Sequence, residues 1–289
     1  MTSALSAATP SRHDRIEVER WPSEIPLLMI TGLIGLAIWG ALILSRIGLV
    51  YAAFFGLFYL VAHAVLIAHI RGSSVRLGPD QFPELYGAVE SIARRMELTP
   101  MPEVYLMQAG GDLNAFATKF FRGRFVVLYS DLLEACGDNL AARDMIIAHE
   151  LGHLKAGHLD LRWLLAPAYL LPWPGRALSR VREYTCDRYG LAGAADTDGA
   201  LKGLTILAAG GKLGPYVNRE AMVRQTESLN TGMMAIAEWY MSHPPLAKRL
   251  AALDAGLARV ATSTAGAGLR GAALGVATGI ALLVATGWV

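Results

Sequence analysis

Two stretches without Asp, Glu, Lys or Arg lie close together near the start of the sequence. They cover residues 25–44 and 47–70, and only Ser45 and Arg46 separate them. Each stretch is long enough to cross the apolar part of a bilayer as a helix, and so short a connection makes two helices antiparallel neighbours. We therefore expect a transmembrane hairpin over residues 25–71. The alternative, two helices buried in a soluble core, fits their length and lack of charge less well.

The regions at the two ends of the sequence differ in composition. Residues 1–24 are polar and mix arginines with acidic residues, which predicts a disordered or loosely attached N-terminal tail. Residues 261–268 are small and polar, as in a linker, while residues 271–289 are uncharged, apolar and just long enough for a third span. The sequence thus predicts about three transmembrane helices, a globular domain at residues 72–260, and a linker with a C-terminal transmembrane helix at residues 261–289.

Charge indicates how the domain lies relative to the membrane. The formal net charge is only +2, so we expect no nucleic acid partner, whereas the 54% of hydrophobic residues favours a lipid bilayer. The side of a membrane protein with more arginine near its spans faces the cytoplasm. Arg46 lies in the hairpin turn, and five arginines flank the spans on the side of the domain: Arg71, Arg76, Arg249, Arg259 and Arg270. We therefore expect a multi-pass protein of the cell membrane with its domain in the cytoplasm.

The globular part alternates helical and extended patterns, which predicts an α+β domain that is mainly helical and has a small β-sheet. Residues 161–173 are apolar but contain Pro167 and Pro172, and they are too few to span a bilayer. We expect this segment to form a lid or to dip into the membrane. The expected strands are 104–107, 114–118 and 125–129, and the expected helices include 79–96, 132–136, 196–209, 219–240 and 246–257.

The sequence H-E-L-G-H over residues 149–153 lies in a segment that we expect to be helical. Residues four apart lie on one face of a helix, so His149 and His153 can point in the same direction and share one Zn²⁺. Glu150, next to the first histidine, can then act as a general base toward a water that the ion acidifies. Two ordinary histidines on an amphipathic helix are the alternative, because three fixed residues also occur together by chance.

A catalytic zinc site needs a third protein ligand and one open position. His158 is the nearest candidate, but its spacing does not fit the known pattern with a third histidine, and we expect it to be a C-terminal helix residue favoured by the helix dipole. Glu183 is the better candidate, because it lies four residues before Asp187 in a second predicted helix. One carboxylate can bind the metal while the other orients a ligand histidine. A solvated, charged helix is the alternative.

Three motifs together resemble those of a known family. H-E-L-G-H at 149–153, S-R-x-x-E-x-x-x-D at 179–187 and Asn-Ala-Phe-Ala at 114–117 are similar to the motifs of the HtpX-like and CAAX-prenyl-protease-type membrane zinc metallopeptidases. The resemblance extends over residues 72–253 and the flanking spans. The chain departs from the family at Cys186, where other members often have an alanine; we expect a buried, inert thiol there.

The resemblance implies a fold and a set of roles. The fold would be a gluzincin-like zincin domain, a protein or peptide would be the substrate, and one Zn²⁺ per chain would be the cofactor. His149, His153 and Glu183 would be the zinc ligands. Glu150 would be the catalytic base, and Asp187 would hold a ligand histidine from behind.

The resemblance also suggests how a substrate is held. Asn114, Ala115, Phe116 and Ala117 would form a strand at the sheet edge that pairs with an extended peptide; an interior strand is the alternative. His243, in a His-Pro sequence before a predicted helix, would stabilise the oxyanion or close the open zinc position. A loop histidine before a helix that starts with proline is the equal alternative.

These features lead to one functional hypothesis and two rivals. The hypothesis is a membrane-anchored zinc endopeptidase that acts in membrane-protein quality control or processes a dedicated peptide. The first rival is an intramembrane metalloprotease, which the charged residues around the zinc helix disfavour. The second is a catalytically silent membrane chaperone or scaffold on the same fold, which the presence of Glu150 disfavours.

Overall fold

The computed structural model describes residues 14–171, 173–229 and 232–259. The predicted linker and third transmembrane helix at residues 261–289 lie outside this part of the chain. Within it, the fold is mainly helical α+β, with a small mixed sheet and two long apolar helices near the N-terminus.

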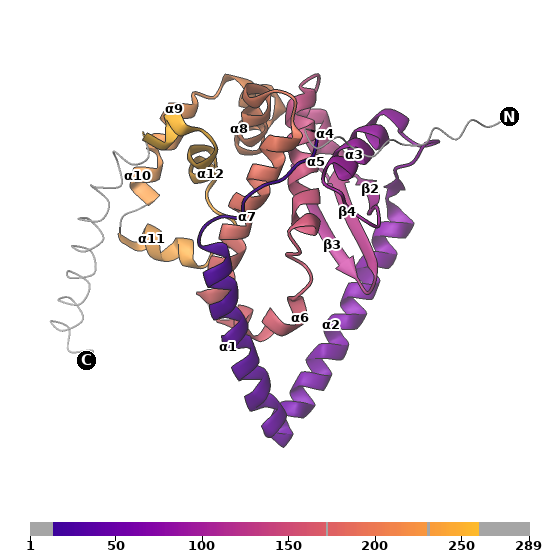
Figure 1. The fold of residues 1–289 in the computed structure, drawn as a ribbon, viewed down its shortest axis with the longest axis vertical. Coiled ribbons are helices and arrows are strands. Elements are labelled where there is room, and N and C mark those ends of the chain that lie inside the picture. The colour runs from indigo at the N-terminus through magenta and orange to yellow at the C-terminus, as the bar shows by residue number, and fades with distance from the viewer. Residues whose placement is uncertain (1–13, 172, 230–231, 260–289) are drawn as a thin grey trace.

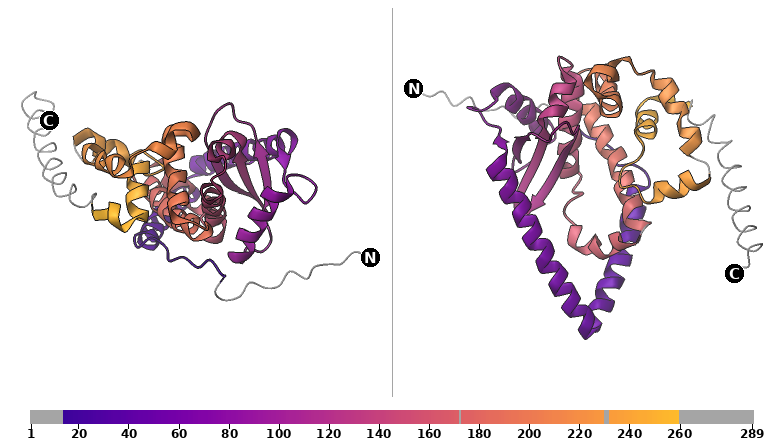
Figure 2. Two further views of the ribbon diagram at one scale, coloured as in Figure 1. Left: turned by 90° about the horizontal axis from the view of Figure 1, so that it is seen from above. Right: turned by 180° about the vertical axis from the view of Figure 1, so that it is seen from behind.

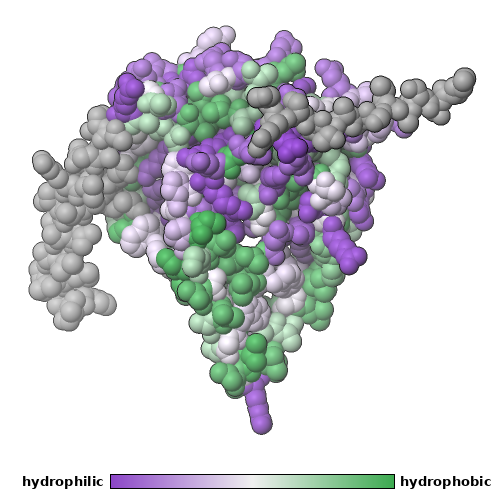
Figure 3. All heavy atoms as spheres, viewed as in Figure 1, coloured by the Kyte–Doolittle hydropathy of each residue, from purple (hydrophilic) through white to green (hydrophobic). Residues whose placement is uncertain are grey.

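The two apolar helices form the predicted hairpin. α1 (Glu24–Leu44) and α2 (Arg46–Ser73) meet at Ser45, whose side chain caps α2 by accepting a hydrogen bond from the Gly48 N–H. They diverge from this turn as the arms of a V, with the domain between and above their open ends (Figure 1). Only 11% of the most apolar window of each helix is buried, which excludes two core helices of a soluble domain. Apolar side chains dominate the outer face of the hairpin (Figure 3).

The sheet has the strand order β1-β2-β4-β3 in the described residues. β1 (Val75–Arg76) pairs antiparallel with β2 (Glu103–Met107), β2 pairs parallel with β4 (Gly123–Tyr129), and β4 pairs antiparallel with β3 (Ala115–Phe120). The three predicted strands are therefore confirmed to within two residues, while the two residues of β1 are too few for a sequence pattern. β3 lies at the edge of the sheet.

The central helices are α5 (Leu140–Lys155) and α7 (Pro174–Gly193), which pack closely along their length. The close approach requires glycine, because a Cβ at Gly193 would lie 2.2 Å from the Cβ of Ala148. The sheet, α3 (Pro83–Arg95) and α4 (Ser130–Cys136) lie beside α5, and α8 (Thr197–Leu213) covers its other side.

Several helix boundaries differ from the prediction. α3, the first helix of the globular domain, begins at Pro83 and not at Pro79, because Gly78 and Gln81 pair as a tight turn. The long helix expected over residues 219–240 is divided into α9 (Arg219–Arg224), α10 (Thr226–Leu229) and α11 (Gly232–Trp239). α12 (Leu246–Leu253) ends four residues before the predicted end, and after a break at Asp254 the chain is helical again over residues 255–259.

The segment before α1 is not a loose tail, and this prediction is wrong for residues 14–23. Ile16 is buried in the main core, and its N–H donates to the Arg95 carbonyl at 2.9 Å. The ring of Trp21 stacks on Tyr184 of α7 at 4.6 Å. Ile16 and Trp21 thus help to fix a segment whose composition is polar.

The apolar segment after the zinc-motif helix lies between the arms of the hairpin. It forms α6 (Arg162–Leu165) and the 3₁₀ helix η1 (Ala166–Leu170), which lie between α1 and α2 in Figure 1 and in the right-hand view of Figure 2. The Trp39 indole N–H donates to the Trp163 carbonyl at 3.0 Å, and Trp163 also contacts the ring of Tyr59 on α2. The segment therefore joins the two arms of the hairpin.

Candidate metal centre and active-site cleft

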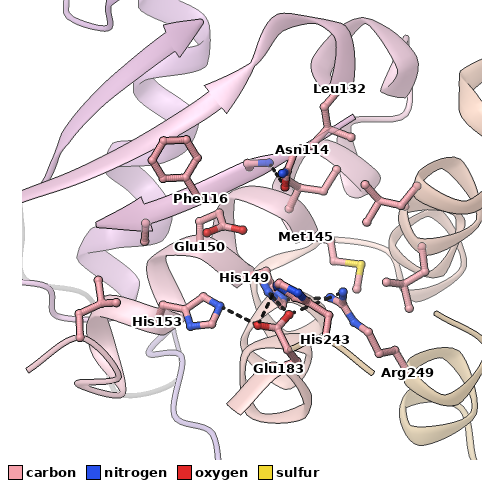
Figure 4. A pocket seen from close by; sticks show the side chains of 17 residues that line it. Asn114, Phe116, Leu132, Met145, His149, Glu150, His153, Glu183, His243 and Arg249 are labelled. Carbon is pink, nitrogen blue, oxygen red and sulfur yellow. Dashed lines mark hydrogen bonds and ion pairs between the residues drawn. The ribbon is translucent and has the colours of Figure 1, made fainter. Parts of the chain in front are cut away.

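The two histidines of the H-E-L-G-H motif lie on one face of α5, as predicted. Asn139 caps the start of the helix, because its side chain accepts a hydrogen bond from the Ala142 N–H. The Nε2 atoms of His149 and His153 both point to the carboxylate of Glu183 on α7, at 3.4 and 3.5 Å (Figure 4). Sequence positions thirty residues apart thus meet because α5 and α7 pack side by side.

The three side chains fit a catalytic zinc ion. Their ligand atoms all lie within 4.8 Å of one another. Two ligands about 2 Å from a tetrahedral ion lie roughly 3.3 Å apart, close to the two distances from histidine to Glu183. Two imidazoles and one carboxylate leave a fourth position open, as a catalytic site requires and a structural site does not.

Glu150 lines the same cavity as the three candidate ligands. The cavity has a volume of about 270 Å³ and lies between α5, β3 and α8. Glu150 sits between the two histidines and the side chain of Phe116 on β3 (Figure 4). It is 8% exposed, so it can meet a ligand in the cavity while most of it is shielded from bulk water.

A second layer of charge lies behind His149. Asp187 is fully buried, and its Oδ1 lies 3.0 Å from His149 Nδ1. Arg249 of α12 donates two hydrogen bonds to the same carboxylate, from Nε at 2.9 Å and from Nη2 at 2.5 Å. Its Nη1 also lies 3.7 Å from Glu183. One arginine therefore neutralises the carboxylate behind the histidine and approaches the carboxylate in the metal site.

The structure changes the interpretation of Arg249. We counted it among the arginines that flank the membrane spans, but it is buried and belongs to the site. Arg249 lies on the apolar face of α12 with Ala247 and Leu250. This position in the sequence pattern indicates burial, which was missed from the sequence alone. A lone arginine among buried apolar residues usually has a carboxylate partner.

The carboxylates and histidines shift one another's protonation. Burial alone would lower the pKa of His149, but hydrogen bonds to Asp187 and Glu183 raise it to about 10. Burial likewise opposes the charge of Glu183, yet hydrogen bonds from His149 and His153 hold the pKa of that carboxyl well below its usual range. The pKa of Asp187 is lowered too, because Arg249 overcomes the effect of burial. Both carboxylates are therefore ionised, which is the state that binds or supports a cation.

The strand with the Asn-Ala-Phe-Ala sequence borders the cleft. Asn114, Ala115, Phe116 and Ala117 all line the cavity. The Tyr129 N–H donates to the Asn114 carbonyl, so by the alternation of an antiparallel ladder the main-chain groups of Ala115 and Ala117 point away from β4. They face the outer edge of the sheet, where the Asn114 side chain already accepts a hydrogen bond from the Ala115 N–H.

Two further histidines lie near the metal centre. His243 lines the cleft from the opposite side, with its Nε2 3.7 Å from Glu183, and its side chain is 66% exposed. His158 is not part of the His149, His153 and Glu183 group, but it lies in a second group of possible ligands with His153 and Cys186. The helix-dipole role predicted for it is wrong, however, because α5 ends at Lys155 and His158 is buried. Burial lowers the pKa of His158 to about 4, so it is neutral.

The comparisons with known proteins agree with this geometry. The sequence profile of peptidase family M48 matches residues 79–171 and 161–256, more than half of the chain. Protease HtpX of Alkalilimnicola ehrlichii is 28% identical over 278 residues, which cover 77% of this chain and 86% of the relative. No solved structure matches the chain.

Two relatives from Arabidopsis thaliana are longer. Plastoglobule-localized metallopeptidase 48, chloroplastic, is 27% identical over 62% of this chain and 58% of its own length. CAAX prenyl protease 1 homolog is 27% identical over 66% of this chain and 51% of its own length. The chain thus spans little more than half the length of these two relatives. The family match and the convergent His-His-Glu site lead to the same conclusion: this chain belongs to peptidase family M48 and is a metallopeptidase by family.

Proposed function

We propose that the chain is a membrane-anchored zinc endopeptidase. The observation that carries this proposal is the convergence of His149, His153 and Glu183 beside Glu150, in a cleft bordered by a free strand edge. The donor set supports one zinc ion per chain with these three residues as ligands. A zinc ion, when bound, supplies a Lewis acid for the scissile carbonyl and lowers the pKa of the attacking water.

The side chains around the ion divide the remaining work. Glu150 accepts a proton from the attacking water and passes it to the leaving amine. Asp187 accepts a hydrogen bond from His149 Nδ1 at 3.0 Å, which directs Nε2 of that histidine to the metal. His243 reaches the cleft from a loop, so it can donate a hydrogen bond to the oxyanion or cover the open position.

The edge of β3 is the proposed binding site for the substrate backbone. The outward N–H and C=O groups of Ala115 and Ala117 can pair with an extended peptide, main chain to main chain. Such a peptide would run along the cavity and past Glu150. The Asn114 side chain holds the Ala115 N–H in the unliganded chain, so a substrate would displace it.

We further propose that the hairpin spans the membrane with the catalytic domain in the cytoplasm. Both open ends of the hairpin adjoin the domain, and Arg46 begins α2 at the far turn. Even without Arg249, more of the arginines near the spans lie on the domain side, which favours a cytoplasmic domain. We also propose that the domain has a gluzincin-like zincin fold and that residues 271–289 form the third span.

The position of Glu24 argues against a site deep in the bilayer. This first residue of α1 lies 3.2 Å from His158, which in turn lies 3.1 Å from His153. The metal centre is therefore level with the end of α1 and not with its middle. A membrane or membrane-proximal protein is the proposed substrate, in quality control or in the processing of a dedicated peptide.

One experiment separates a peptidase from a silent scaffold. The purified chain in detergent should cleave an unfolded protein such as casein, and a zinc chelator should abolish the cleavage. Restoring zinc should restore it. A zinc-loaded, folded chain that cleaves neither casein nor any membrane-fraction peptide would favour the scaffold.

A further inference from the structure

We propose that His158 and Glu24 are positioning residues that hold the second zinc-ligand histidine, His153, through a chain of hydrogen bonds from the first residue of the membrane hairpin. The inference rests on the proposed role of His153 as a zinc ligand. It gives a function to a histidine that neither the sequence motif nor the cleft uses.

Two contacts link the three residues. His153 Nδ1 lies 3.1 Å from His158 Nδ1, with the two rings nearly perpendicular. His158 Nε2 lies 3.2 Å from the Glu24 carboxylate. Both His158 and Glu24 are almost completely buried, at 4% and 0% exposure, so water does not compete for these bonds.

The donors and acceptors in the hydrogen bonds from Glu24 to His153 are compatible with a metal at His153. Nε2 of His153 faces Glu183 and must keep its lone pair for the ion, so Nδ1 carries the proton. That N–H donates to Nδ1 of His158. The proton of neutral His158 is then on Nε2, where it donates to the Glu24 carboxylate. Each ring nitrogen of His153 and His158 thus has a defined role as donor, acceptor or metal ligand.

Each metal-ligand histidine therefore has its own partner at Nδ1. His149 uses Asp187, which lies four residues after Glu183 and was predicted from the sequence. His153 uses His158 and, beyond it, Glu24. Ligating histidines almost always give their second ring nitrogen to a carboxylate, carbonyl or water, and such partners orient the ring and raise its basicity.

Glu24 is held as firmly as a positioning carboxylate requires. Its carboxylate accepts hydrogen bonds from the Arg20 guanidinium and the Thr185 hydroxyl, in addition to His158. Arg20 also donates to the Ala156 carbonyl at the end of α5. Glu24 thus ties the start of α1 to both helices that carry the zinc ligands, which links the membrane anchor to the metal centre.

A second metal ion is the rival explanation for this cluster, because His153, His158 and Cys186 also bring three ligand atoms together. That ion would require His153 to lose both ring protons and Cys186 to become a thiolate. Cys186 Sγ lies 3.5 Å from His158 Nδ1, which fits a weak S–H donor and needs no thiolate. A hydrogen bond explains the 3.1 Å separation of the two histidines without either cost.

The test measures zinc affinity and not only activity. The full chain in detergent is titrated with zinc against a fluorescent chelator, and zinc per chain is counted by metal analysis. We expect one zinc per wild-type chain and a zinc Kd raised about 10–100-fold in His158→Phe, the usual effect of removing such a partner. His158→Gln, which keeps an acceptor and a donor, should recover most of the affinity. In the Co²⁺-substituted chain, His158→Phe should shift the visible absorption, which a role in stability alone would not move.

Glu24→Gln is the second variant. It is nearly isosteric, so the hydrogen bonds from Glu24 to His153 can still be tested if His158→Phe does not fold. It should also weaken zinc binding, and the double variant with His158→Phe should bind no more weakly than His158→Phe alone. Cys186→Ala is the matched control: its thiol contacts His158 Nδ1 at 3.5 Å, but it is not one of the residues that link Glu24 to His153. Its zinc Kd should match that of the wild-type protein.

Three results would overturn the inference: Glu24→Gln with wild-type affinity and spectrum, two zinc ions per chain, or a loss in Cys186→Ala as large as in His158→Phe. A failure of the proposed function looks different. In that case His153→Ala itself would keep the zinc of the wild-type chain.

Discussion

Arg249 offers the sharpest test of how the site is held together. Its guanidinium forms two hydrogen bonds with the fully buried Asp187, at 2.9 and 2.5 Å, and lies 3.7 Å from Glu183. Arg249→Met keeps much of the side-chain volume but removes the guanidinium, so in a metal-free site the two buried carboxylates keep only their contacts with the histidines. We expect this change to destabilise the metal-free chain more than the zinc-bound chain, because zinc supplies positive charge to the same carboxylates.

The magnitude follows from the burial of the pair. Removing one partner of a buried ion pair costs roughly 3–5 kcal/mol. His149 still donates to Asp187 at 3.0 Å, so we expect the lower end, about 3 kcal/mol of unfolding free energy. For a domain of this size, that loss lowers Tm by roughly 6–12 °C.

The assay is thermal unfolding of the detergent-solubilised chain, followed by tryptophan fluorescence, with chelator and with zinc. Arg224→Met is the matched control, because its ion pair with Glu220 is exposed and contributes only about 0–1 kcal/mol. Arg249→Lys should lie between Arg249→Met and wild type, since it keeps the charge and loses the paired geometry. If Arg249→Met unfolds in chelator within 1–2 °C of Arg224→Met, the arginine does not stabilise the buried carboxylates and the reasoning is wrong.

Three further predictions address the ligands, the membrane topology and the substrate strand. Glu183→Ala should lose most of the single zinc that metal analysis finds in the wild-type chain; a fully loaded variant would mean that the third ligand is another residue. A reporter that is active only outside the cytoplasm should be active when fused after Val289 and silent when fused after Gly268, and the reverse pattern would contradict three spans. Ala117→Pro removes an N–H that points to the free edge of β3, where proline is tolerated, so KM should rise while zinc affinity stays constant. Thr118→Pro breaks the ladder to β4 and should instead unfold the strand. An unchanged KM in Ala117→Pro would rule out strand pairing.

The local patterns predicted the elements of the fold well. The spacing of His149 and His153 and the runs without charge depend only on neighbours in sequence, so the helix faces and the hairpin followed directly. The strands were found for the same reason. Element ends were less accurate, because turns such as the one at Gly78 depend on single pairings.

What the sequence could not predict depends on contacts between distant segments. Glu24 and His158 are 134 residues apart, and each looks ordinary in its own segment: one is among mixed charges, the other follows a helix. Arg249 is 62 residues from its partner Asp187 and looks like a surface charge until α12 packs on α7. Burial of a charged residue is set by such packing and leaves only a weak local trace.

The position of the apolar segment at residues 161–173 shows the same limit. Its composition allowed a lid or a membrane-dipping element, and only the contacts of Trp163 with Trp39 and Tyr59 place it between the hairpin arms. Figure 1 shows that the divergence of the arms creates the room for it. No pattern within the segment encodes the angle between two other helices.

Glu150→Gln tests the central claim most directly. Glutamine keeps the shape and the hydrogen bonds of the side chain but cannot accept the proton of the attacking water. The measurement compares zinc content and casein cleavage of the variant and the wild-type chain in the same detergent. We predict one zinc per chain in both and a turnover that is lower by at least about 10²–10⁴-fold in the variant, the usual effect of losing a general base. A variant that keeps its zinc and full activity, or that loses its zinc, would contradict the assignment of Glu150 as the catalytic base.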